Sequence, residues 1–222
     1  MSKDNLQVLS INNIKNSYLI GFALVNFIIF GFYLFMYKVV GVTGHIPTYM
    51  KVYLIISLIL WLLLYLQEKG KIFANFNKYN YKSRIIIYFI INILAGYNVP
   101  YLMSSAYVFF YSGSEDSVFE YWLLIGVIIL ISLLGLFLFC YSEFEMFGNQ
   151  QNTLIKLIGI LIVIASLIGL IYVSIIAPAD SEEGRVIWVG CIFLMCIHVL
   201  VGRSFFYLAV LINDIKEEGL KL

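Results

Sequence analysis

Residues 84–111 read RIIIYFIINILAGYNVPYLMSSAYVFFY, a stretch long and apolar enough to cross a bilayer as one helix. It carries a polar or small residue at every fourth position: Asn92, Gly96, Pro100 and Ser104. Residues four apart lie on one face of a helix. Because polar groups are costly against lipid, this face is predicted to look into protein or water, with the other spans packed around it.

Pro100 is expected to interrupt this helix. A proline has no N–H, so the carbonyl of Gly96, four residues back, loses its helical partner. In hydrocarbon such a carbonyl needs a neighbouring helix, a hydroxyl or a water to satisfy it. The sequence therefore predicts a helix break at Gly96 and Pro100, supported by other parts of the chain.

The composition is that of a membrane-embedded chain. Of the 222 residues, 62% are hydrophobic and 12% are charged, and the mean hydropathy is +0.95. Soluble domains are about 25% charged. A net charge of +1 gives no basic field for direct nucleic-acid binding. The two histidines and three cysteines are too few for an evident metal site or disulfide framework, so no metal or cofactor is expected.

We expect an all-α integral membrane protein, a polytopic bundle of about six transmembrane helices. A polar N-terminal segment, residues 1–16, is either an interfacial helix or a frayed tail. Residues 17–212 form the transmembrane domain, and residues 213–222 form a polar, helical tail. The predicted spans are about 17–40, 49–67, 85–111, 119–141, 154–177 and 186–208.

The distribution of basic residues predicts the orientation. With both termini in the cytosol, eleven of the fourteen Lys and Arg residues lie on the inner side, all but Lys38, Lys51 and Arg185. Cytoplasmic loops carry an excess of Lys and Arg. We therefore expect an N-in, C-in protein. The Asn-, Lys- and Ile-rich composition suits an A/T-rich bacterial gene and hence the bacterial cytoplasmic (inner) membrane.

The inner loop between the second and third spans is strongly basic. Its five basic residues are in the first place a signal that this loop is cytosolic, and they are suited to contact anionic lipid headgroups. The loop and the two termini are also the longest stretches available to a soluble partner. The five residues are Lys69, Lys71, Lys78, Lys82 and Arg84.

Three polar residues from three spans fall at a similar depth. At 1.5 Å per residue, Asn26 and Asn92 lie about 14 and 12 Å from the inner ends of their helices, and His198 lies about 12 Å from the inner face. We expect them to form an intramembrane polar layer, with Asn98 and the proline site just above it. The layer is either a solute, ion or proton site or a set of structural contacts between helices.

Arg203 follows His198 by five residues and is expected at the inner headgroup level. There it can extend toward water and anchor the helix, or bind an anion or lipid headgroup. Ala165 and Gly169 form a small-xxx-small pair that favours close helix packing.

No enzyme is expected, and no catalytic residues are assigned. Glu182 and Glu183 with Arg185 resemble the paired glutamates of intramembrane CAAX-type proteases. Here the pair lies in an outer loop and lacks both the arginine one turn further on and the deep histidines of that family. No Walker motif or Gly-rich phosphate cradle is present in the sequence.

The sequence favours a non-enzymatic scaffold or sensor that forms a homo-oligomer and recruits a cytosolic protein. Small six-span proteins of bacterial immunity or phage-defence systems have this architecture. The comparison rests on architecture alone. The alternatives are a channel or small-solute transporter, or the membrane subunit of an ABC-type transporter. A pore requires a continuous polar lining, and the second, fourth and fifth spans offer almost no polar side chain mid-membrane.

Overall fold

The computed structural model describes residues 3–40, 46–69, 81–109, 115–148, 150–176 and 181–218. None of these residues forms a β-strand. The helices are α1 (Lys3–Lys15), α2 (Leu19–Val40), α3 (Thr48–Lys69), α4 (Tyr81–Ser104), α5 (Glu115–Glu143), α6 (Thr153–Ile176) and α7 (Ser181–Glu218), with short 3₁₀ helices η1 (Ser105–Phe109) and η2 (Met146–Gly148).

Six segments are long and apolar enough to cross a membrane, which supports a multi-pass membrane protein. They are Leu6–Phe32, Thr48–Lys69, Lys82–Val108, Val118–Glu143, Thr153–Ile176 and Val186–Ile215. The all-helical class and the six long helices are thus confirmed. The first segment takes in most of α1 and so begins well before the predicted 17–40 span.

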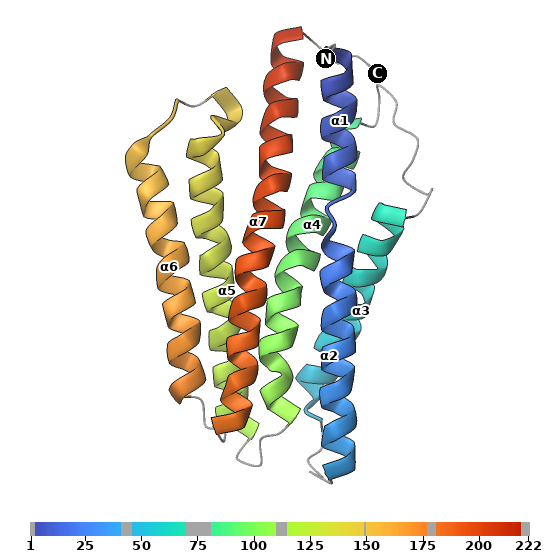
Figure 1. Ribbon diagram of the computed structural model, residues 1–222, viewed down its shortest axis with the longest axis vertical. Coiled ribbons are helices and arrows are strands. Elements are labelled where there is room, and N and C mark those ends of the chain that lie inside the picture. The colour runs from blue at the N-terminus through green and yellow to red at the C-terminus, as the bar shows by residue number, and fades with distance from the viewer. Residues whose placement is uncertain are drawn as a thin grey trace.

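Helix α4 is the centre of the bundle, where it contacts α1, α2, α3, α5 and α7. Figure 1 shows it between α7 on one side and α2 and α3 on the other. In its most hydrophobic window 61% of the residues are buried, against 17% for α6. The face of Asn92, Gly96, Pro100 and Ser104 is buried, as its spacing predicts.

The expected break at Gly96 and Pro100 is not present. Helix α4 runs through Pro100 and only at Ser105 tightens into the 3₁₀ turn η1. A proline costs one backbone bond but its fixed φ is helical, and here α7 supports the turn closely. A Cβ added to Gly190 of α7 would collide with Ser104 Oγ and lie 3.1 Å from the carbonyl oxygen of Pro100.

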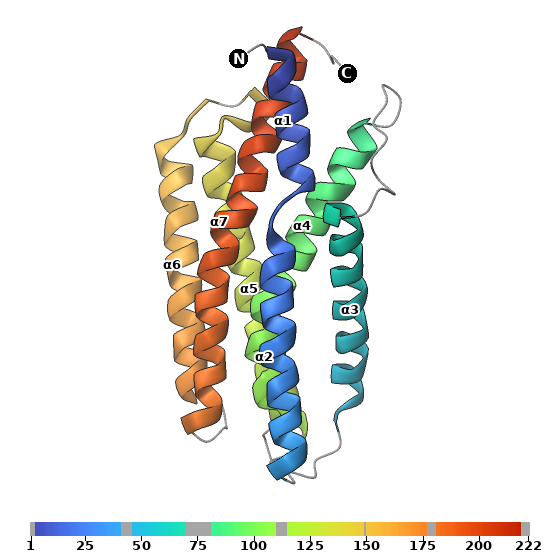
Figure 2. The same ribbon diagram turned by 45° about the vertical axis from the view of Figure 1, so that its right-hand side comes forward.

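Helix α1 is part of the bundle rather than a loose tail. Ile11 and Ile14 are buried in a second apolar cluster with Ile85 and Tyr88 of α4 and Leu211 of α7. In Figures 1 and 2 α1 and the last turns of α7 lie together and extend beyond the ends of α3, α5 and α6. We call this pair of segments, residues 3–15 and 205–218, the projection, and the end of the bundle that holds it the terminal end.

Helices α5 and α6 meet backbone to backbone at two glycines. A Cβ added to Gly159 would lie 2.6 Å from Phe139 N and 2.7 Å from Gly135 O. At Gly169, one of the pair expected from the sequence to mediate packing, an added Cβ would meet only the Ile128 side chain, at 3.6 Å. The close crossing therefore lies nearer the terminal end than expected.

Gly159→Ala is predicted to destabilise the protein by about 1–3 kcal/mol, because the new methyl group would collide with backbone atoms that cannot rotate away. The measurement is thermal unfolding in mild detergent, with an expected loss of several degrees. Gly169→Ala is the matched control and should be neutral or stabilising, since alanine favours a helix. Equal unfolding temperatures for the two variants would contradict the close crossing.

Candidate functional site

The connection between α1 and α2 is a sharp turn inside what would otherwise be one long helix. Asn16 N donates to Asn12 O at 2.8 Å, and Tyr18 has a φ of 63°. That left-handed conformation is uncommon for a residue other than glycine. Asparagine and serine favour helix ends over helix interiors, which fits the sequence Asn16-Ser17 at this point. The last carbonyl groups of α1 therefore lose their helical donors and need others.

Two buried side-chain amides supply those donors. Asn92 Nδ2, from α4, donates to the carbonyl of Ile14 at 2.7 Å. Gln67 Nε2, from α3, donates to the carbonyl of Lys15 at 3.1 Å and to Asn92 Oδ1 at 2.8 Å. Both amide side chains are fully buried. The end of α1 is thus fixed by side chains of two transmembrane helices.

Two hydroxyl groups extend this network. Asn92 Nδ2 also donates to Ser204 Oγ of α7 at 3.3 Å. Ser17 Oγ donates to Glu68 Oε1 at 2.8 Å. Residues of α1, α3, α4 and α7 and of the connection to α2 therefore meet at these hydrogen bonds. They lie next to the turn between α1 and α2, which Figure 2 shows. We call this set of hydrogen bonds the junction; its residues are Ile14, Lys15, Ser17, Gln67, Glu68, Asn92 and Ser204.

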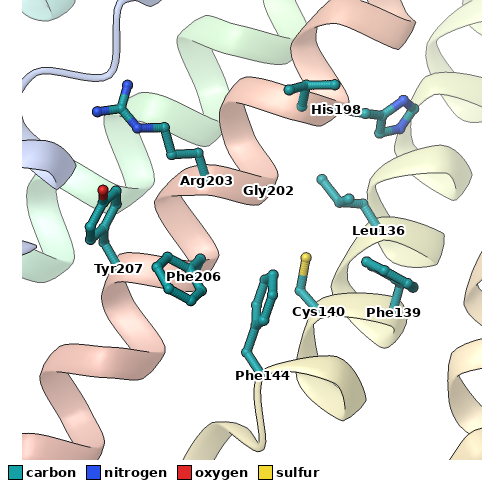
Figure 3. A pocket seen from close by; sticks show the side chains of 10 residues that line it. Leu136, Phe139, Cys140, Phe144, His198, Gly202, Arg203, Phe206 and Tyr207 are labelled. Carbon is teal, nitrogen blue, oxygen red and sulfur yellow. The ribbon is translucent and has the colours of Figure 1, made fainter.

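Arg203 connects α7 to α1 on the same side of the bundle. Its Nη2 donates to Asn13 Oδ1, and its guanidinium lies 4.8 Å from the ring centre of Tyr18 and 5.5 Å from that of Tyr207. Figure 3 shows the side chain pointing away from Leu136 and Cys140 of α5. The residue expected to anchor α7 at the headgroups thus also fastens α7 to α1 and to the turn that follows it.

The other amides of the expected polar layer lie further from the terminal end. Asn26 Nδ2 of α2 donates to the carbonyl of Val99 at 2.6 Å. Asn98 Oδ1 accepts from the hydroxyl groups of Tyr53 at 2.8 Å and Ser57 at 3.2 Å, both on α3. Asn98 is six residues after Asn92, which places it about 9 Å further along α4.

His198 lies on another side of α4. Its Nε2 is 2.9 Å from Ser132 Oγ of α5, and its ring meets the Tyr97 ring edge to face with centres 5.7 Å apart. It also borders the groove of about 590 Å³ between α5 and α7 that Figure 3 shows. Among the described residues, none of the four expected layer side chains hydrogen-bonds to another. They stand in separate groups, because Asn26 lies at the level of Val99, about 10 Å along α4 from Asn92, and His198 faces α5.

Of the basic loop, Lys71 and Lys78 lie outside the described residues. Lys69 and Lys82 are exposed at the end of α3 and near the start of α4, and Arg84 is partly buried. Their role in docking stays a prediction. In the parts of the chain that are described, no three His, Cys, Asp or Glu side chains gather as a metal site would require.

Residues 3–218 match a family model described as a domain of unknown function (DUF5079). The match covers nearly the whole chain, so the protein belongs to this family. No curated protein and no solved structure matches the chain.

Asn92→Leu is predicted to loosen α1, because it removes the closest donor to the Ile14 carbonyl and one of the two acceptors of the Gln67 amide, which keeps its bond to the Lys15 carbonyl. Buried unpaired groups cost about 1–3 kcal/mol each. We expect hydrogen exchange of the α1 amides, followed by mass spectrometry, to rise about tenfold or more.

Asn98→Leu is the matched control for this experiment. It removes hydrogen bonds between α3 and α4 of the same kind, but none to α1. Exchange in α1 should remain at the wild-type rate. An α1 that exchanges equally in wild type and Asn92→Leu would show that the junction amides do not hold it.

Proposed function

We propose that this protein is a non-enzymatic scaffold or sensor subunit of a bacterial inner membrane, which presents the projection to a soluble cytosolic partner. Both termini lie at one end of the bundle (Figure 1). The excess of Lys and Arg at that end favours the cytosolic side for it. The N-in, C-in orientation is part of the proposal.

The observation that carries the proposal is the length of α7, together with the packing of its last turns on α1 and α4. It has 38 residues, or about 57 Å of helix, whereas the hydrocarbon core of a bilayer is about 30 Å thick. Its last turns pack on α1 through Leu211, and Ile11 and Ile14 complete the contact with α4. A packed pair of helices that extends beyond the ends of α3, α5 and α6 is suited to present a fixed surface to a partner.

The junction gives this surface a direct connection to the membrane. Gln67 and Asn92 belong to transmembrane helices and bond to the carbonyls that end α1. A shift of α3 or α4 would therefore move the groups that hold the end of α1. Small shifts of packed helices of this kind carry signals across interfaces. This supports a sensor that reports the state of the bundle to its partner.

The polar groups of the bundle give less support to a channel. Within the described residues, Asn26, Asn98 and His198 bond to nearby backbone or hydroxyl groups, with apolar core side chains packed around them. Such bonds serve to join helices. The proposed homo-oligomer rests on the broad exposed apolar faces, α6 above all.

The proposed partner surface includes two exposed apolar residues of α1. Val8 and Leu9 are 48% and 39% exposed, while their neighbours Gln7 and Ser10 are buried. Apolar side chains at this end suit a partner with an apolar, partly acidic surface, given the basic loop ends at Lys69 and Lys82. The exposed residues can be changed without entering the apolar cluster beneath them.

The test is purification of the tagged full chain in mild detergent from a native-like bacterial host, with mass spectrometry of co-eluting proteins and the particle mass. We expect a homo-oligomer with a stoichiometric soluble partner, and at least a tenfold loss of that partner from Val8→Asp/Leu9→Asp. Gln150→Glu, an exposed change in the connection between α5 and α6 at the same end, should retain the partner. A co-eluting transporter ATPase would favour a permease instead, and a lone homo-oligomer would favour a channel.

A further inference from the structure

Arg203 of α7 carries a positive charge that no carboxylate of the described residues neutralises. An ion pair within that part of the chain joins Lys156, near the start of α6, to Glu143, at the end of α5. Arg203 donates instead to the neutral side-chain oxygen of Asn13. An arginine side chain stays protonated in proteins. Its charge is therefore open to an anion from outside the chain.

The guanidinium of Arg203 keeps unused donors at the protein surface. It has five N–H groups in a planar fork, and the bond to Asn13 uses Nη2. Arg203 is partly exposed, and none of its nitrogens is a buried atom without a partner, so the remaining donors are not enclosed. The guanidinium carbon lies 4.8 Å from the ring centre of Tyr18 and 5.5 Å from that of Tyr207. These contacts fix the fork in place.

The carboxylate at the turn between α1 and α2 is engaged elsewhere. Glu68 of α3 accepts a hydrogen bond from Ser17 Oγ at 2.8 Å, and it also accepts from the backbone N–H groups of Leu19 and Ile20. A carboxylate at this place interacts favourably with the N-terminus of α2. Glu68 therefore caps α2 and leaves Arg203 without a counter-charge.

The guanidinium lies at the level where the bilayer ends. The apolar segment Thr48–Lys69 finishes beside the turn between α1 and α2, since its Glu68 bonds to Ser17. Arg203 lies over the ring of Tyr18, the next residue of the turn. Phospholipid headgroups begin where the hydrocarbon core ends. The free donors are therefore at the depth of phospholipid phosphates.

The surface around Arg203 is apolar and exposed. Tyr18 is 60% exposed, and Val199, one helical turn before Arg203 on α7, is 72% exposed. Residues four apart lie on one face of a helix, so Val199 stands beside the arginine on the side toward the bilayer centre. A cation at the headgroup level next to an apolar surface suits a molecule with an anionic head and an aliphatic chain.

We propose that Arg203 binds the phosphate group of an anionic phospholipid in the leaflet at the terminal end. The planar fork donates to two phosphate oxygens, the geometry in which arginine recognises phosphate best, and an aliphatic chain of the lipid lies along Val199. A zwitterionic phospholipid binds less tightly, because its ammonium group is repelled by the guanidinium. The site is independent of a soluble partner and so goes beyond the scaffold or sensor role.

The experiment titrates the purified, delipidated full chain in a non-ionic detergent with phosphatidylglycerol or with phosphatidylcholine, and counts bound lipids by native mass spectrometry. We expect a site that binds phosphatidylglycerol about tenfold more tightly than phosphatidylcholine, the effect of a hydrogen bond between charged groups. Inorganic phosphate should not compete, because it lacks the aliphatic chain.

Two variants test the role of the guanidinium. Arg203→Gln removes the charge but keeps a donor for Asn13, and it should lower the affinity for phosphatidylglycerol to that for phosphatidylcholine. Lys156→Gln is the matched control. It also removes a positive charge near the same end, but one that Glu143 already neutralises, so the preference should remain as in the wild type.

Thermal unfolding separates this role from a purely structural one. If Arg203 binds the lipid, phosphatidylglycerol raises the unfolding temperature of the wild type above its value in phosphatidylcholine, because a ligand stabilises the state that binds it. In Arg203→Gln this difference disappears. A structural arginine would instead lower the unfolding temperature equally in both lipids and leave the difference intact, which would overturn the proposal.

Three further results would also overturn it: equal affinity of the wild type for the two lipids, a preference retained in Arg203→Gln, or competition by inorganic phosphate, which would indicate a soluble anion. If Arg203→Gln fails to fold, Arg203→Lys decides the matter. Lysine keeps the charge but not the fork, so a preference reduced several-fold supports the site and an unchanged preference excludes it. Loss of a soluble partner from Val8→Asp/Leu9→Asp has no bearing on these results.

Discussion

Two side-chain amides, those of Gln67 and Asn92, hold the end of α1, and the arrangement of the terminal end depends on them. A helix that stops leaves carbonyl groups without donors, and in a poorly hydrated place each unpaired group is costly. Because the donors come from α3 and α4, the turn at Tyr18 is stable only when those helices are in place. The position of α1 is therefore a property of the membrane bundle rather than of the N-terminal sequence.

The cost of polar groups that lack partners also explains why α4 is central. Its polar face cannot lie against lipid, so five other helices pack around it. Its two amides bond to three neighbours: Asn92 joins α4 to α1, α3 and α7, and Asn98 joins α4 to α3 a second time. Gly96 permits close approach, since a Cβ there would meet the side chains of Val201 and Ile197 of α7. Polar contacts set which helices meet, and small residues set how near they come.

The sequence was sufficient for the helical membrane class, the six long apolar segments and the buried face of α4, because these follow from length, composition and four-residue spacing. It was not sufficient for the junction. Gln67 stands at the end of an apolar run and marks only the limit of a span, and Ser17 and Ser204 carry no signal of a partner. Depth counted from approximate span ends is imprecise and rotation about the helix axis cannot be counted at all, so Asn26, Asn92 and His198 were expected together although Asn26 lies at Val99 and Asn92 at Ile14. The continuation of α4 through Pro100, against Gly190 of α7, likewise depends on tertiary contacts.

The most direct test of the central claim is the distance between α1 and the transmembrane helices, measured by pulsed electron spin resonance. Spin labels at Val8 of α1 and Leu154 of α6, both exposed, would be placed in a cysteine-free background and a lipid bilayer. If α1 is fixed to the bundle, the distance distribution is narrow and has a single peak, and Asn92→Leu broadens it. A broad distribution in the wild-type protein would contradict the account, because α1 would then move independently of the helices proposed to hold it.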